Sequence, residues 1–74
     1  LYDWLITLEI EKNTVILEKV NERLGQLGTE INDLEQANGD PAKIAELTDQ
    51  LARVAAAGVA AKGEIDRLQT QKTA

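Results

Sequence analysis

The fold is decided near the middle of the chain by the stretch Asn38-Gly39-Asp40-Pro41. Gly39 suits the left-handed backbone position that follows the last turn of a helix, because glycine has no Cβ to clash there. Asp40 suits an N-cap, and Pro41 suits the first helical position, where a missing N–H costs nothing. The stretch therefore predicts that one helix ends here and another begins, and so short a connection forces the two helices to run antiparallel.

Both flanks of this turn are rich in helix-forming residues and contain no further proline. We expect one helix over about residues 3–37, a turn at 38–41 and a second helix over about 41–72. Residues 1–74 then form a single all-α domain, an antiparallel two-helix hairpin. A chain of 74 residues buries little surface for a stable monomer, so we expect this hairpin to belong to a larger helical bundle or assembly.

Apolar residues recur at alternating steps of three and four on both sides of the turn, which is the spacing of a coiled-coil seam. The seam runs over residues 6–34 on one side, with Asn13 as its polar member, and over residues 44–68 on the other. Folding the chain back at Gly39 pairs seam positions whose residue numbers sum to 78. The hairpin is therefore expected to be coiled-coil-like. Asn13 either fixes the register or oligomer state, or is hydrated near the open end.

The composition excludes most catalytic chemistry. The chain has no cysteine and no histidine, so it lacks thiolate nucleophiles, imidazole bases, disulfides and the usual zinc or copper ligands. It also lacks a glycine-rich phosphate-binding loop, an EF-hand pattern and the Glu-x-x-His motif of di-iron proteins. We therefore expect a protein that is not an enzyme and that uses no cofactor or metal ion.

The formal net charge of −5 arises entirely in the first half of the chain. Residues 1–37 contain eight acidic and three basic side chains, whereas residues 38–74 contain five of each. Without a basic cluster the chain cannot neutralise several phosphates, so nucleic acid is not an expected partner. The longest apolar stretch, residues 54–61, is too short to span a bilayer, and membrane contact is not expected either.

The start of the sequence does not indicate the cellular compartment in which the protein acts. The chain opens at Leu1 and contains no methionine, so we expect a processed product, a fragment or the ordered part of something longer. No basic segment followed by an apolar core of the signal-peptide type is present.

The second helix carries more small apolar residues than the seam needs. Residues 54–61 place them at every heptad position, which is typical of a helix enclosed on several sides. Gly58 and Gly63 each cost about 1 kcal/mol in a helix, which favours close packing against further copies or a partner over an exposed alanine-rich surface. The candidate interface residues here, which we call the alanine belt, are Ala56, Val59, Ala60 and Gly63.

The N-terminal stretch also has too many apolar residues for one face. It contains the single tryptophan and the single tyrosine of the chain, and such residues are favoured interface anchors. Docking of a partner is the leading interpretation, ahead of an ordinary local core or contact with a membrane surface. Asp3 and Glu9 disfavour the membrane, because no basic residue precedes Lys12. The candidate interface residues here, which we call the N-terminal surface, are Leu1, Trp4, Leu5, Leu8 and Val15.

Residues 40–51, Asp40-Pro41-Ala42-Lys43-Ile44-Ala45-Glu46-Leu47-Thr48-Asp49-Gln50-Leu51, resemble the loop and second helix of type III secretion needle subunits. The layout is also similar to that of the small hairpin co-chaperones of the same systems. The resemblance implies a helical hairpin that assembles into a secreted filament, with Asp40 and Pro41 as turn formers. The chain departs from needle subunits in its polar C-terminal segment, residues 69–74.

Together these features predict a non-catalytic structural or assembly protein whose partners are protein helices. The hairpin either self-associates into a homo-oligomer or helical assembly, or completes a bundle with partner helices. The alternative is a small adaptor or chaperone hairpin that covers a helix of one client protein.

Overall fold

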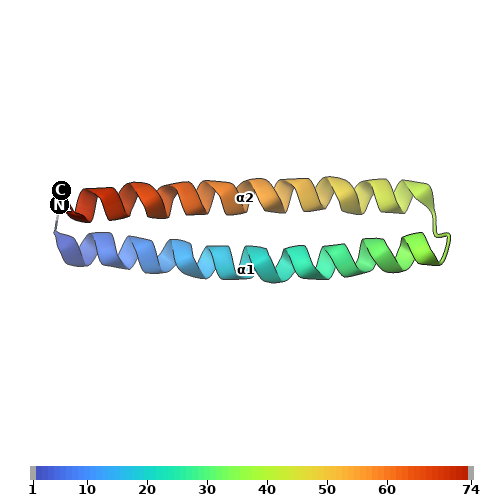
Figure 1. Cartoon of the computed structure of the whole chain (residues 1–74), viewed down its shortest axis with the longest axis horizontal. Coiled ribbons are helices and arrows are strands. Elements are labelled where there is room, and N and C mark those ends of the chain that lie inside the picture. Colours follow the sequence, from blue (N-terminus) through green and yellow to red (C-terminus); the bar gives the residue numbers. More distant parts are fainter. Residues whose placement is uncertain (1, 74) are drawn as a thin grey trace.

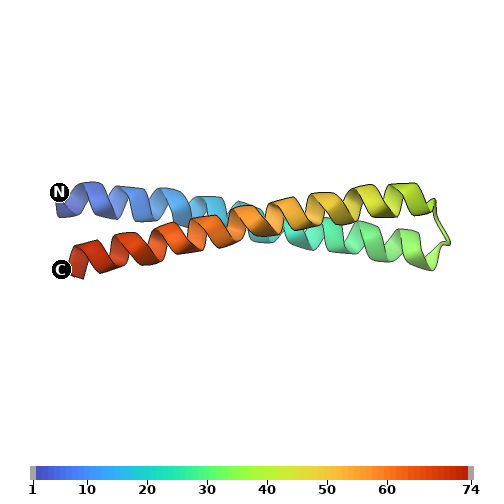
Figure 2. The ribbon, with the colours of Figure 1, turned by 90° about the horizontal axis from the view of Figure 1, so that it is seen from above.

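The computed structural model describes residues 2–73, which form two α-helices joined by a short turn. Helix α1 spans Asp3–Gln36 and helix α2 spans Pro41–Thr73. The helices lie side by side and antiparallel in a rod of 54 × 14 × 12 Å, so the start of α1 and the end of α2 meet at one end, the open end (Figure 1). Seen from above, they cross at a shallow angle near the middle of the rod (Figure 2). The predicted all-α helical hairpin is confirmed.

The end of α1 is closed by a turn in which Asn38, and not Gly39, is left-handed. Asn38 has a φ of 54°, and no glycine in the part of the chain that the structure describes has a positive φ. The N–H of Gly39 donates to Leu34 O at 2.7 Å, and that of Asn38 donates to Glu35 O at 3.2 Å. These two bonds form a Schellman motif with Asn38 at C′. The prediction that Gly39 holds this position is therefore wrong by one residue, because asparagine also tolerates the left-handed region.

Gly39 lies where the backbone passes close to α1. A Cβ built at position 39 lies 2.9 Å from Leu34 Cδ2 and 3.1 Å from Leu34 O, so a side chain there would force Leu34 to shift. On the other side of the turn, Asp40 Oδ1 accepts a hydrogen bond from the N–H of Ala42 at 3.0 Å, as an N-cap does. Pro41 is the first residue of α2. Asp40 and Pro41 thus take the turn positions predicted for them.

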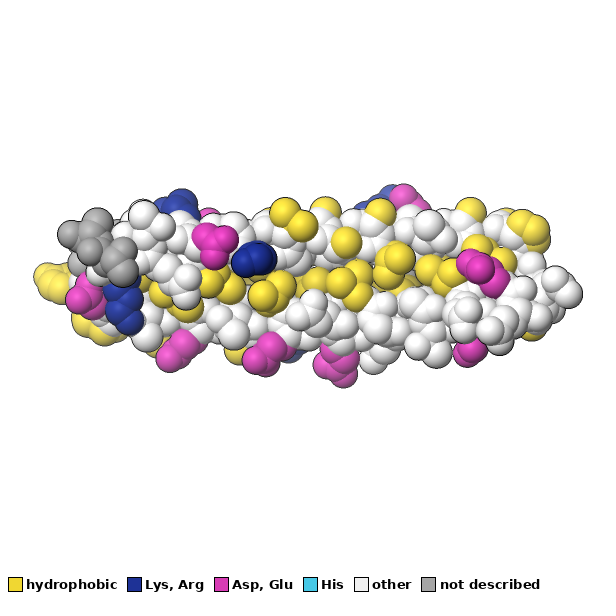
Figure 3. All heavy atoms as spheres, viewed as in Figure 1, with side chains coloured by type: hydrophobic (Ala, Val, Ile, Leu, Met, Phe, Trp, Pro, Cys, Tyr) yellow, Lys and Arg dark blue, Asp and Glu magenta, His cyan; other side chains and the backbone are white. Residues whose placement is uncertain are grey.

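The core is a single line of side chains between the helices, visible in Figure 3 as the apolar band along the rod. Every position of the predicted seam over residues 6–34 and 44–68 is buried or half-buried. Leu27 is 0% exposed and is the largest fully buried side chain of the described residues. The buried members of the seam are Ile6, Val20, Leu27, Leu47, Gly58, Ala61 and Leu68.

The register of the two helices is visible where Gly58 faces Val20. A Cβ built at position 58 lies 2.9 Å from Val20 Cγ1, and the two residue numbers sum to 78, as predicted. Val20 therefore occupies the space that the missing side chain leaves. The small size of Gly58 is therefore used inside the hairpin, against Val20.

Candidate interaction surfaces

The N-terminal surface lies on the side of α1 that points away from α2. Trp4, Leu8 and Val15 are 62%, 51% and 48% exposed, and their spacing of four and seven residues places them on one helix face. Leu5 is half-buried at the edge of that face. Leu1 lies outside the described residues. The structure thus brings Trp4, Leu8 and Val15 onto one outer face, which the rest of residues 2–73 leaves largely exposed.

Sequence reasoning missed Ile16 as a member of the exposed apolar set. Ile16 is 40% exposed, although its neighbour Leu17 lies in the seam and is half-buried. Ile16 could have been found from its place in the heptad repeat. An apolar residue one position before a seam residue lies on the flank of the helix. Tyr2, at 71% exposed, extends the exposed apolar area to the open end of the hairpin.

The alanine belt lies on the outer side of α2, and all four of its residues are exposed. Val59 is 74% exposed, the highest value among the exposed large hydrophobic side chains. A Cβ built at Gly63 meets nothing within 4 Å, in contrast to Gly58. Figure 3 shows apolar side chains along the outer edge of α2 as well as between the helices. Among the described residues, none packs against Gly63 closely enough to require its small size.

Charged side chains are distributed unequally between the helices. The ion pairs found among residues 2–73 all lie within α2, at Lys43–Glu46, Asp49–Arg53, Lys62–Asp66 and Glu64–Arg67. Helix α1 carries most of the acidic side chains, which line its outer edge in Figure 3, and its described residues make no ion pair. Exposed pairs of this kind add little stability. Eight of the nine charged side chains of α2 thus form ion pairs within the helix, Lys72 being the exception, whereas those of α1 form none.

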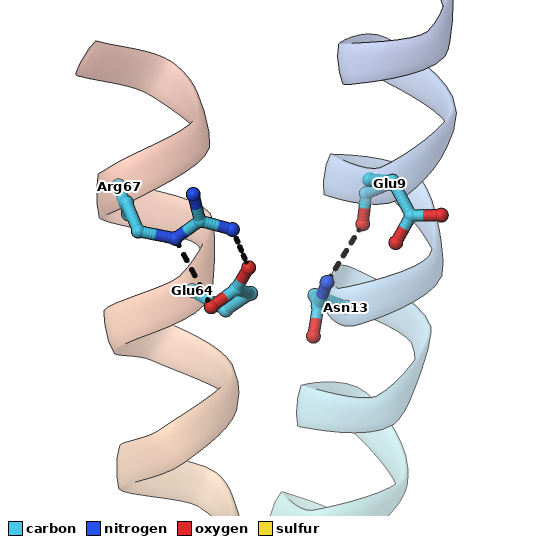
Figure 4. A network of polar contacts seen from close by, with 4 residues as sticks. All are labelled: Glu9, Asn13, Glu64 and Arg67. Atoms are coloured by element: carbon cyan, nitrogen blue, oxygen red, sulfur yellow. Dashed lines mark hydrogen bonds and ion pairs between the residues drawn. The ribbon is translucent and has the colours of Figure 1, made fainter. Parts of the chain in front are cut away.

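Asn13 and the Glu64–Arg67 pair face the gap between the helices near the open end (Figure 4). Asn13 is half-buried, and its Nδ2 donates to Glu9 O in its own helix at 2.9 Å. Arg67 Nε donates to Glu64 Oε2 at 3.3 Å, and a second guanidinium nitrogen contacts Oε1. This hydrogen bonding lowers the pKa of Glu64 and raises that of Arg67. Each of these hydrogen bonds thus joins residues of the same helix.

Because Asn13 bonds within α1, Asn13→Leu is expected to stabilise the hairpin. A leucine places an apolar side chain on the seam. The carbonyl of Glu9 loses its bond to the Asn13 side chain but still accepts the backbone hydrogen bond of the helix. We expect a gain of about 1 kcal/mol, which raises the melting temperature by about 4–8 °C in a chain of this size. Thermal unfolding followed by circular dichroism measures it. An unchanged or lower melting temperature would mean that Asn13 makes a contact that the single hairpin does not show.

The described residues contain no enclosed site for a small ligand. No pocket is present among them, and no group of three or more His, Cys, Asp or Glu side chains is placed to hold a metal ion. Neither helix, as described, has the length and apolar character needed to cross a membrane. Comparisons of the sequence and structure with protein families, curated proteins and solved structures found no match.

Proposed function

We propose that this chain is a non-catalytic structural or assembly protein, a helical hairpin that associates with further copies of itself or with partner helices. The observation that carries the proposal is the exposure of Trp4, Leu8 and Val59 on outer faces that the seam does not use. Burial of apolar area is favourable by about 25 cal/mol per Å², and tryptophan is among the preferred interface anchors. Burying these outer faces is therefore favourable in free energy, and only a contact with another molecule can bury them.

The narrow core supports the same proposal. Two helices bury one line of side chains, and in the middle of that line Gly58 and Ala61 supply little apolar area. Ordering each residue costs about 1–2 kcal/mol of conformational free energy, which a small core offsets poorly. Association with another helical surface supplies additional burial.

Sedimentation velocity over a wide range of concentration tests self-association of the chain alone. We expect the mean mass to rise with concentration. Val59→Glu places a charge on the alanine belt and is expected to weaken assembly through that face, because an unpaired buried charge costs several kcal/mol. Thr48→Glu, which adds the same charge at an exposed position outside both surfaces, is the control. A wild-type chain that stays monomeric throughout would contradict self-association and favour an adaptor that binds a client helix.

The narrower form of this proposal is a subunit of a secretion-type filament. Its support is the resemblance at residues 40–51 together with the turn geometry of Asp40 and Pro41. Electron microscopy of concentrated protein tests it. Regular filaments would support this form, whereas discrete small oligomers would contradict it and leave the broader proposal standing.

A further inference from the structure

We propose that two copies of this chain associate in parallel through the outer face of α1, around a two-fold axis that runs along the helices. This inference rests on the self-association proposed above, and it names the surface, the occupant and the orientation of one contact. It follows from the arrangement of charged residues beside the N-terminal surface, which the preceding proposal does not use.

The outer face of α1 consists of three rows of residues, and within each row the members are seven residues apart in sequence. The middle row is apolar, the second row is acidic and the third is basic. Their members are, in that order, Leu8 and Val15, Glu11 and Glu18, and Lys12 and Lys19. Residues three and four positions along a helix lie on either side of the starting residue, so each apolar residue has an acid on one flank and a lysine on the other. The charges on this face are therefore separated by sign.

These charged side chains are not used within the hairpin. All six residues of the three rows are exposed, and no α1 residue in the described range makes an ion pair. Glu11 and Lys12 are adjacent in sequence, as are Glu18 and Lys19, and adjacent residues on a helix do not face each other. In α2, acids and bases that stand three or four residues apart form ion pairs, whereas in α1 Glu9 and Glu22, which stand three residues from Lys12 and Lys19, form none. The two charged rows of α1 are thus free to meet charges on another molecule.

A second copy supplies matching charges in one orientation only. When two identical helices pack in parallel, opposite flanks meet, so the acidic row of each copy lies beside the basic row of the other. When they pack antiparallel, like flanks meet, and the acids face acids while the lysines face lysines. Like charges across such a contact are destabilising. The charge pattern therefore selects the parallel arrangement.

The apolar residues fit the same arrangement. Around a two-fold axis the same patch meets itself, so Leu8 and Val15 each contact their own equivalents in the other copy. Trp4 continues the acidic row and Leu5 the basic row, so these two side chains meet across the contact near the open end. The middle row continues to Glu22, whose carboxylates repel each other at the axis, so the close contact ends before that residue. The contact is short, and we expect a dimer that forms at high protein concentration.

Charge reversal tests the pairing of the rows. Lys12→Glu with Lys19→Glu makes both flanks acidic, and Glu11→Lys with Glu18→Lys makes both basic. We expect each double variant alone to dimerise at least about tenfold more weakly than the wild type at low ionic strength, and an equimolar mixture of the two to recover the dimer. Lys43→Glu with Lys62→Glu makes the same change in net charge as the first double variant, but on α2, and is expected to leave dimerisation unchanged. Sedimentation velocity measures the wild type, the three double variants and the mixture.

Cysteine cross-linking tests the orientation. In a parallel dimer, Leu8→Cys and Val15→Cys each bring two identical cysteines together at the axis, and each variant is expected to form a disulfide with itself. A mixture that links position 8 to position 15 more readily than either links to itself would show an antiparallel contact and overturn the proposal.

The outcomes separate this inference from the proposed function. Wild-type chain that associates, with charge-reversal variants that associate equally well, overturns the parallel α1 contact and leaves self-association intact. Wild-type chain that stays monomeric at all concentrations overturns both.

Discussion

Replacing Leu27 with alanine is expected to unfold most of the hairpin in dilute solution. Leu27 is 0% exposed, and the loss of a fully buried leucine costs about 2–5 kcal/mol. A single small core supplies rarely more than about 3–5 kcal/mol, so this one substitution removes most of the stability available. Urea unfolding followed by circular dichroism, at low protein concentration, measures the change.

The matched control is Ile16→Ala, which truncates a large apolar side chain of the same helix at a position that is 40% exposed. We expect a loss of less than about 1 kcal/mol there, because little apolar area leaves the interior and alanine favours the helix. Equal losses for the two variants would mean that the hairpin core is not centred on Leu27.

The second large effect is expected from Gly58→Leu. A Cβ at position 58 lies 2.9 Å from Val20 Cγ1, and the β-branched valine has little rotamer freedom in a helix to move aside. The added side chain forces the helices apart, and such overpacking costs about 1–3 kcal/mol. The same urea titration measures the loss.

Gly28→Leu is the control for the glycine substitution itself. A Cβ at position 28 meets nothing within 4 Å, so leucine there is expected to stabilise the helix by up to about 1 kcal/mol. Adding Val20→Ala to Gly58→Leu is expected to restore part of the loss. If Gly58→Leu proves as harmless as Gly28→Leu, the contact between Gly58 and Val20 does not form in solution.

The hairpin could be predicted from the sequence because two independent patterns agree on it. The turn at Asn38–Pro41 fixes where the chain reverses, and the seam fixes which side of each helix faces inward. All the seam positions are indeed buried or half-buried. The register also followed from the sequence, since Val20 and Gly58 face each other as the position of the turn requires.

What the sequence could not provide is the detail that depends on local geometry. Both Asn38 and Gly39 tolerate the left-handed region, so composition does not determine which of them ends α1. Likewise, the cost of Gly58 and of Gly63 in a helix is the same, and only the helix spacing shows that Val20 fills the space beside one of them. The exposure of Trp4, Leu8 and Val15 does follow from helical phase, because the seam fixes which side of α1 faces away from α2.

The antiparallel arrangement also sets the order in which the hairpin closes. Seam partners beside the turn, such as Leu34 and Ile44, are close in sequence, whereas partners at the open end, such as Ile10 and Leu68, are separated by most of the chain. The entropy lost on closing a loop grows with its length, so pairing is expected to start at the turn and spread towards the open end. Trp4 and Leu8 therefore lie at the end that closes last and opens first. We therefore expect a second molecule bound at this end to slow the separation of the two helices, and with it the unfolding of the whole hairpin.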